Sequence, residues 1–67
     1  MSMLKVIEIL SESNKSWEDA AQNAVEQAAK TLDGIKSIYV EHFEATVGDD
    51  GSIAKYRVNA KITFLLK

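Results

Sequence analysis

The chain has 67 residues and a formal net charge of −2 at neutral pH, and it contains no cysteine and one histidine. This composition excludes disulfides, cysteine-based metal sites and a multi-histidine metal site within one chain, and the lack of a basic patch argues against a nucleic-acid partner. No apolar run approaches the roughly 20 residues of a membrane span, and the first stretch, MSMLKVIEIL, is too short and too charged for a signal peptide. We therefore expect one cytoplasmic domain spanning residues 1–67.

A domain of this size has little core to stabilise it. Chains near 60 residues bury only about 60% of their unfolded surface, and the usual remedies are disulfides, a metal or oligomerisation. Hydrophobic residues make up 46% of the sequence, which is typical of a folded chain. Because disulfides are excluded, we expect good packing or self-association to supply the missing stability.

Residues 3–10, MLKVIEIL, are predicted to form a strand with apolar residues on both faces. One face carries Lys5, Ile7 and Ile9. The other face carries Leu4, Val6, Glu8 and Leu10. A strand of this kind is usually covered on both faces.

The polar run SESNKS, residues 11–16, breaks that pattern and leads into a helix. The Ser16 hydroxyl suits the N-cap, and Asp19 lies three residues on in the capping-box position. The helix is predicted to run from Trp17 to Leu32, because apolar residues recur there at i, i+3 and i+4 spacing. The stripe consists of Trp17, Ala20, Ala21, Ala24, Val25, Ala28 and Leu32. Its alanines allow the helix to lie close to a sheet, with Trp17 as a packing residue.

After Gly34, a natural helix stop, the chain reads as two long strands joined by a turn. Residues 35–47 form the first strand. GDDG, residues 48–51, is predicted to be a turn and not a calcium loop, because it lacks the spaced oxygen ligands of one. Residues 52–66 alternate between an apolar and a polar face and complete an antiparallel hairpin. The order is β-α-β-β, and the fold class is α+β.

The predicted elements do not match in length within one chain. A helix of 16 residues is roughly 24 Å long. Strands of 13 and 15 residues are roughly 43 and 50 Å long. One helix cannot cover such a hairpin, so part of the sheet needs another cover. The simplest cover is a second copy of the same chain.

Several segments together resemble the dodecin family. The most specific are KVIEI at residues 5–9, SWEDAA at residues 16–21 and the sequence AxKTL at residues 28–32. The C-terminal pattern YxVxxKIxF, the length and the order of elements also agree, so the resemblance covers nearly the whole chain.

The resemblance implies a three-stranded antiparallel sheet partly wrapped around one helix, and a hollow homododecamer. It also implies non-catalytic binding of flavins, in pairs, at pockets on symmetry axes. Family members are regarded as flavin storage or buffering proteins, so the implied ligands here are FMN or riboflavin. The assembly would cover the sheet surface that one helix leaves exposed.

Two positions depart from the flavin-binding pattern of the family. A tryptophan that stacks on the flavin ring is replaced by Ser37, in the segment IKSIYV. A glutamine that hydrogen-bonds the polar edge of the ring is replaced by Arg57, in the segment KYRV. Stacking on an aromatic side chain is worth about 1–3 kcal/mol per ring, so flavin binding should be weakened here.

Three residues are therefore the candidate ligand-binding set: Ser37, Arg57 and Tyr39. Arg57 can donate to ring carbonyls, stack on a ring or pair with phosphate, but an arginine on a polar strand face is as often solvated or salt-bridged. Tyr39 lies two residues beyond Ser37 on the same face and would supply a replacement ring, unless it packs at an interface. His42 is expected to be an ordinary polar-face residue.

A second function class stays open beside flavin binding. A dodecin-fold assembly that has given up flavin would be a structural shell, or would bind another anion or a metal ion at its symmetry axes. An enzyme is not expected, because the sequence pairs no nucleophile with a base and places no carboxylates in a recognisable catalytic frame.

Overall fold

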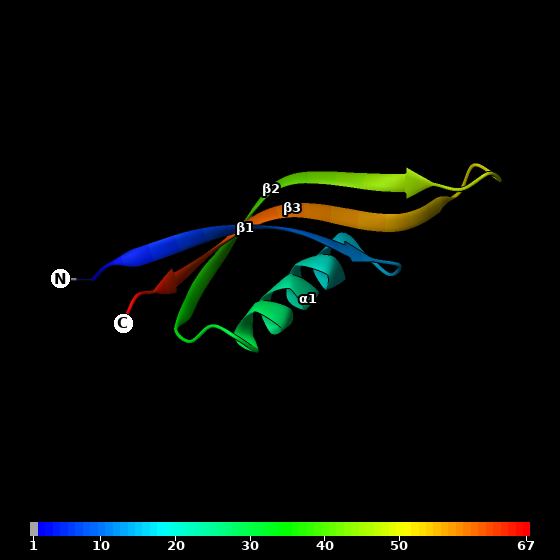
Figure 1. Cartoon of the computed structure of the whole chain (residues 1–67). Coiled ribbons are helices and arrows are strands. Elements are labelled where there is room, and N and C mark those ends of the chain that lie inside the picture. Colours follow the sequence, from blue (N-terminus) through cyan, green and yellow to red (C-terminus); the bar gives the residue numbers. More distant parts are fainter. Residues whose placement is uncertain (1) are drawn as a thin grey trace.

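The computed structural model describes residues 2–67, and its elements follow the predicted β-α-β-β order. The elements are β1 Leu4–Ser13, α1 Trp17–Ala29, β2 Ile35–Val47 and β3 Ile53–Leu65. In this part of the chain the strands form an antiparallel sheet in the order β1-β3-β2, and α1 lies across one face of it (Figure 1). The predicted α+β fold, with its sheet partly wrapped around one helix, is confirmed.

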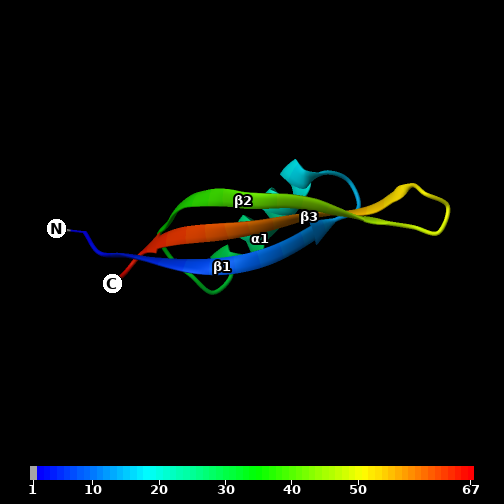
Figure 2. The same cartoon turned by 90° about the horizontal axis from the view of Figure 1, so that it is seen from above.

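Strand β3 is the centre of the sheet and supplies most of the core. Figure 2 shows it between β1 and β2. Ile62 lies opposite Ile7 on β1 and Ile38 on β2. Ile62, Ala60 and Val58 are fully buried. The strict alternation of β3 therefore decides which face of the sheet α1 covers.

The start of α1 is capped as the sequence predicts. Ser16 Oγ accepts a hydrogen bond from the Asp19 amide at 3.0 Å. The Asp19 carboxylate does not close a capping box but accepts from Ser13 Oγ at 2.6 Å. The sheet-facing side of α1 consists of buried alanines: Ala20, Ala24 and Ala28. Their small side chains allow the helix backbone to lie close to β3.

The helix ends at Ala29, three residues before the predicted end at Leu32. The Lys30 amide donates to Gln27 O and the Thr31 amide to Ala28 O, each three residues back. Such bonds tighten the last turn and stop the helix. Leu32 still packs against the core, so the apolar stripe outlasts the helical backbone.

The first strand is longer than predicted. It runs to Ser13, three residues into the polar segment that we expected to be a break. Polar contacts hold this extension: Glu12 pairs with Arg57 on β3, and Ser13 is buried and bonded to Asp19. A polar run predicts a break, because the sequence alone does not show that its side chains bond to partners on neighbouring elements.

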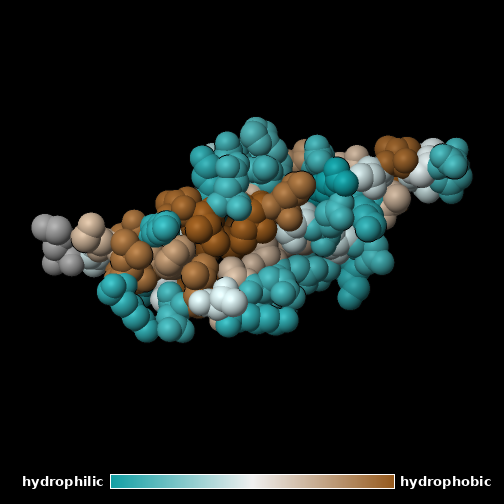
Figure 3. Space-filling view, viewed as in Figure 1, coloured by the Kyte–Doolittle hydropathy of each residue, from teal (hydrophilic) through white to brown (hydrophobic). Residues whose placement is uncertain are grey.

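The described chain extends over 52 × 20 × 13 Å, and β2 and β3 continue past α1 as a hairpin arm (Figure 1). The predicted mismatch between helix and hairpin is therefore present. Figure 3 shows apolar residues over the middle of the chain and again near the tip of the arm. At the tip, Val47 is 65% and Ile53 is 48% exposed. In residues 2–67, α1 lacks the length and apolar character that a membrane crossing requires.

Candidate functional site

The face of the sheet that points away from α1, called the open face below, carries all three candidate ligand-binding residues. Strand register arranges this face in rows across the three strands. One row joins Val6, Thr63 and Ser37. The next three rows are Glu8–Lys61–Tyr39, Leu10–Asn59–His42 and Glu12–Arg57–Glu44. The open face is thus apolar and small at one end and charged at the other.

Ser37 is exposed and lies beside a bulge in β2, since the register shifts between Ile35 and Ser37. Its row contains only short side chains, so the sheet surface is open above it. Tyr39, in the next row, is 65% exposed. The two residues therefore share one face, as the strand period predicts, and the tyrosine ring is free to contact a ligand laid over Ser37.

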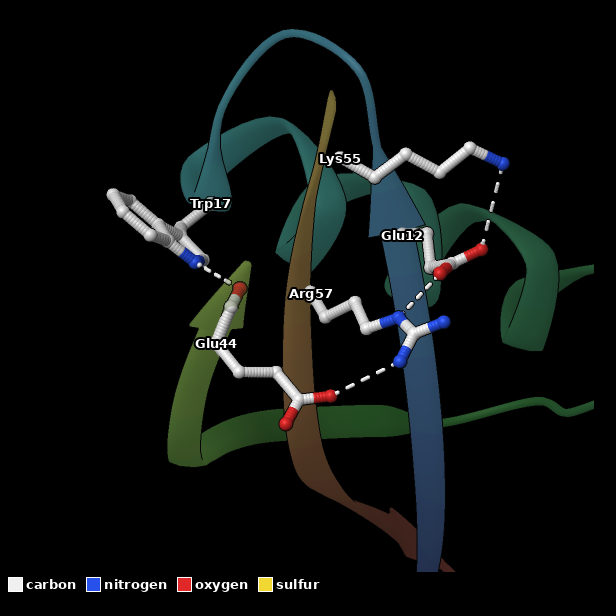
Figure 4. Close-up of polar contacts among 5 residues, drawn as sticks. All are labelled: Glu12, Trp17, Glu44, Lys55 and Arg57. Atoms are coloured by element: carbon white, nitrogen blue, oxygen red, sulfur yellow. Dashed lines mark hydrogen bonds and ion pairs between the residues drawn. The ribbon is translucent and has the colours of Figure 1, made fainter. Parts of the chain in front are cut away.

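Arg57 is not free in the same way, because two glutamates hold it from opposite sides (Figure 4). Its Nε donates to Glu12 on β1, and its Nη1 donates to Glu44 Oε1 on β2 at 3.3 Å. The register places both glutamates opposite Arg57. Lys55 Nζ lies 3.8 Å from the other oxygen of Glu12.

Electrostatics follow from this geometry. The hydrogen bond and charge of Arg57 lower the pKa of Glu12, although partial desolvation works against the shift. The hydrogen bonds from Arg57 to Glu12 and Glu44 raise the pKa of the guanidinium in turn. Both shifts favour the charged forms of Glu12 and Arg57.

A hollow of about 240 Å³ lies beside the charged row, lined by Leu10, His42, Glu44 and Asn59. Asn59 Oδ1 is covered but accepts no hydrogen bond from residues 2–67. His42 is exposed on this polar face, as predicted. The hollow thus presents an oxygen that lacks a donor.

Ser37 and Arg57 are too far apart to share one ligand within a single copy. Ser37 pairs with Thr63, six residues along β3 from Arg57. At about 3.4 Å per residue, that separation is roughly 20 Å. Tyr39 lies between them, opposite Lys61. The structure brings Ser37 and Tyr39 together but leaves Arg57 in a separate cluster.

Comparison with known proteins identifies the family to which this architecture belongs. A sequence profile of the dodecin family matches residues 3–67. The chain belongs to the dodecin family. The resemblance in the KVIEI, SWEDAA and AxKTL segments is therefore confirmed.

Dodecins of known structure superimpose on this chain over nearly its whole length. A variant of the Thermus thermophilus dodecin has a TM-score of 0.93 and 28% identity, covering 100% of this chain and 98% of its own. The dodecin of Streptomyces coelicolor has a TM-score of 0.93 and 27% identity, covering 98% and 93%.

A third dodecin is named for a different ligand. Calcium dodecin of Mycobacterium tuberculosis is 36% identical over 67 residues, which are 100% of this chain and 93% of that protein. Its crystal structure is described as having a novel calcium-binding site, and it matches with a TM-score of 0.85 and 35% identity over 98% of this chain and 93% of that one.

Sequence reasoning missed the role of Glu12 in this dodecin. The signal was present, because Glu8, Leu10 and Glu12 continue the same alternation into the segment that we read as a break. Extending the strand by that alternation would have placed Glu12 on the polar face, although only the register puts it opposite Arg57.

Proposed function

We propose that this chain is the subunit of a cytoplasmic, dodecin-type homododecamer that binds a small ligand without converting it. The first ligand we assign is a flavin, riboflavin or FMN, which the particle would store or buffer. The observation that supports this most is the open face itself. It is an exposed surface with Ser37 and Tyr39 side by side, at the place where the family resemblance puts a ligand pocket.

Flavin affinity should be lower than in family members that carry the tryptophan. A serine offers no stacking surface, and each lost kcal/mol weakens binding about fivefold. The exposed ring of Tyr39 offsets part of this loss. Arg57 contributes little to binding the polar edge of the flavin ring while its guanidinium is paired with Glu12 and Glu44.

The proposed site needs more than one copy of the chain. Ser37 and Arg57 are separated by six positions along β3, which is longer than a flavin ring system. If both act on one ligand, they come from different copies. This requirement agrees with pockets on symmetry axes, which the family resemblance implies.

The second candidate is a shell that binds an ion instead of a flavin, and calcium is the ion favoured by the 36% identity to calcium dodecin. Within residues 2–67 of one copy, no three metal-ligating side chains gather. A cation site would therefore also be built between copies. Arg57 and its two glutamates are not assigned to it.

Flavin titration tests the first candidate. Ser37→Trp should restore a stacking wall, because the short side chains of its row leave room for an indole. We expect at least tenfold tighter binding of riboflavin and FMN, which corresponds to about 1–3 kcal/mol of stacking. Adding Arg57→Gln should improve binding further by restoring the glutamine. The measurement is quenching of flavin fluorescence by the assembled proteins.

Gln22→Trp, on the exposed side of α1, is the matched control for an added indole. It should leave quenching unchanged. If the assembled Ser37→Trp protein quenches no better than wild type, the transfer of the family pocket to Ser37 and Arg57 is wrong. Calorimetric titration of the wild type with CaCl₂ separates the second candidate, which requires calcium binding without flavin quenching.

A further inference from the structure

The charged row of the open face is built as a closed triad across all three strands. Arg57 lies on the central strand, with Glu12 opposite it on one edge strand and Glu44 opposite it on the other. Both carboxylates accept from the guanidinium, and Figure 4 shows it drawn between them. The register of the sheet thus fixes the triad, since no side chain has to reach beyond its own row.

The triad and Lys55 together carry no net charge. Two carboxylates face one guanidinium, and the Lys55 ammonium 3.8 Å from Glu12 balances the second negative charge. An approaching anion therefore meets no net positive charge, although an arginine lies at the site. Arg57 has five N–H donors, and the two that define its orientation are already used.

The neighbouring hollow offers two acceptor oxygens, which lie beside the His42 ring and Leu10. Glu44, the member of the triad on β2, also lines this hollow together with Asn59. Asn59 Oδ1 is covered and lacks a donor among the described residues. A ligand edge that pairs with the Asn59 and Glu44 oxygens must donate a hydrogen bond, as the N–H of a cyclic imide or amide does. The dianion of a phosphate monoester, the main form at neutral pH, carries only acceptors and would face the Glu44 carboxylate.

Resting on the proposed function, we infer that Glu12 and Glu44 determine the charge preference of the ligand site by masking Arg57. With both carboxylates in place, the site takes an uncharged ring with an N–H edge and rejects a phosphate. Without them, Arg57 becomes an anion-binding residue, because a free guanidinium binds phosphate oxygens in a bidentate manner. Both glutamates are positioning residues that act through Arg57.

The test compares riboflavin with FMN, and uses inorganic pyrophosphate as a probe that needs no flavin pocket. In the assembled Glu12→Gln/Glu44→Gln protein, we expect the ratio of FMN to riboflavin affinity to rise at least fivefold over wild type. Pyrophosphate binding, measured by calorimetry, should rise at least fivefold as well and should weaken again as salt is added. Adding Arg57→Gln to this variant should abolish both gains.

Glu8→Gln is the matched control, since it removes a carboxylate from the open face of β1, in the row of Lys61 instead of Arg57. It removes one negative charge where the double variant removes two, and it should produce neither gain. If Glu8→Gln raises pyrophosphate binding as much as the double variant, or if the double variant gains nothing, the masking inference is overturned. If no protein quenches flavin but the Arg57-dependent gain in pyrophosphate binding appears, the proposed flavin function fails and the masking stands.

Discussion

At the scale of single residues, Trp17 shows how one side chain joins three elements. Its indole packs edge-on against Tyr56 of β3, with ring centroids 4.8 Å apart, and against Phe43 of β2 at 6.0 Å. Its Nε1 donates to the backbone oxygen of Glu44 at 2.9 Å. Glu44 lies on β2, whose outer edge has no strand partner in the described sheet. Trp17 therefore docks the helix and also occupies an acceptor on an open sheet edge.

Substitution separates these two roles of Trp17. Trp17→Phe keeps an aromatic ring and loses the N–H donor, so it should reduce the free energy of unfolding by about 1 kcal/mol. Trp17→Ala loses the packing as well and should cost about 3–5 kcal/mol and impair assembly. Urea denaturation followed by circular dichroism, at one fixed protein concentration, measures both. A Trp17→Ala protein that assembles normally but no longer binds ligand would show that this residue belongs to the site.

Glu12 makes the stability of the chain depend on acid. Its pKa is lowered in the folded state by Arg57, so its contribution is present above the ordinary carboxyl pKa and disappears as the pH falls through the lowered value. Unfolding midpoints should therefore drop on acidification from neutral pH to below the ordinary glutamate pKa, about 4.3.

The Glu12→Gln protein should show a shallower drop over the same range, whereas Glu8→Gln should follow the wild type. Because Glu12 is exposed and Arg57 is only half-buried, solvent screens the pair. The difference between the curves should therefore be small and should shrink in salt. Identical acid profiles for wild type and Glu12→Gln at low salt would rule out the linkage.

At the scale of elements, the connection from α1 to β2 depends on Gly34. Its φ of +71° lies in the left-handed region, and a Cβ there would lie 3.2 Å from Leu65 Cβ. The Gly34 carbonyl also accepts from the Leu65 amide at 3.0 Å. The glycine thus serves both the turn and a close approach to β3.

Gly34→Ala should destabilise the fold by about 1–2 kcal/mol for the left-handed backbone alone, and by more because of the contact with Leu65. Gly51→Ala is the matched control, since Gly51 has a φ of +84° but a Cβ there would meet nothing within 4 Å. Thermal unfolding of the two proteins at equal concentration compares them. Equal destabilisation would mean that the close approach to Leu65 has no cost.

Elements with a strict apolar period were predictable, and those whose ends depend on distant partners were not. The alternation in β3 and the alanine stripe of α1 each indicate which side chains are buried. The strand, the helix and their buried faces could therefore be predicted from the sequence. The end of β1 depends on Arg57 and Asp19, which lie elsewhere in the chain. The same applies to the candidate site. Ser37 and Tyr39 share a face because of the strand period. The pairing of Arg57 with Glu12 and Glu44 depends on the register of the strands, which the sequence does not show.

At the scale of the whole molecule, the chain leaves much apolar surface uncovered. Large side chains about half or more exposed occur on the open face and on the hairpin arm: Leu4, Val6, Leu10, Tyr39, Val47 and Ile53. A patch of this extent on a soluble domain usually marks an interface. Few residues are fully buried to compensate, so other copies are the natural cover.

We therefore expect the purified protein to form a particle of about twelve chains, a closed assembly that leaves no patch uncovered. Light scattering and sedimentation in dilute neutral buffer measure its mass. Val6→Lys, which places a charge in the open-face row of Ser37, should shift the distribution toward smaller species, whereas Gln22→Lys on the exposed side of α1 should not. A stable folded monomer would contradict both the surface argument and the assembly.

The central position of β3 has a consequence for how the chain is made. β1 and β2 both pair with β3 and not with each other, yet both precede it in the sequence. During synthesis neither strand has its partner until β3 has left the ribosome, and the pairing of Leu4 with Leu65 joins residues at nearly the full sequence separation. Long loops of this kind close slowly. β1 therefore has no strand partner until β3 has been made, and the local β2–β3 hairpin should form before β1 is added.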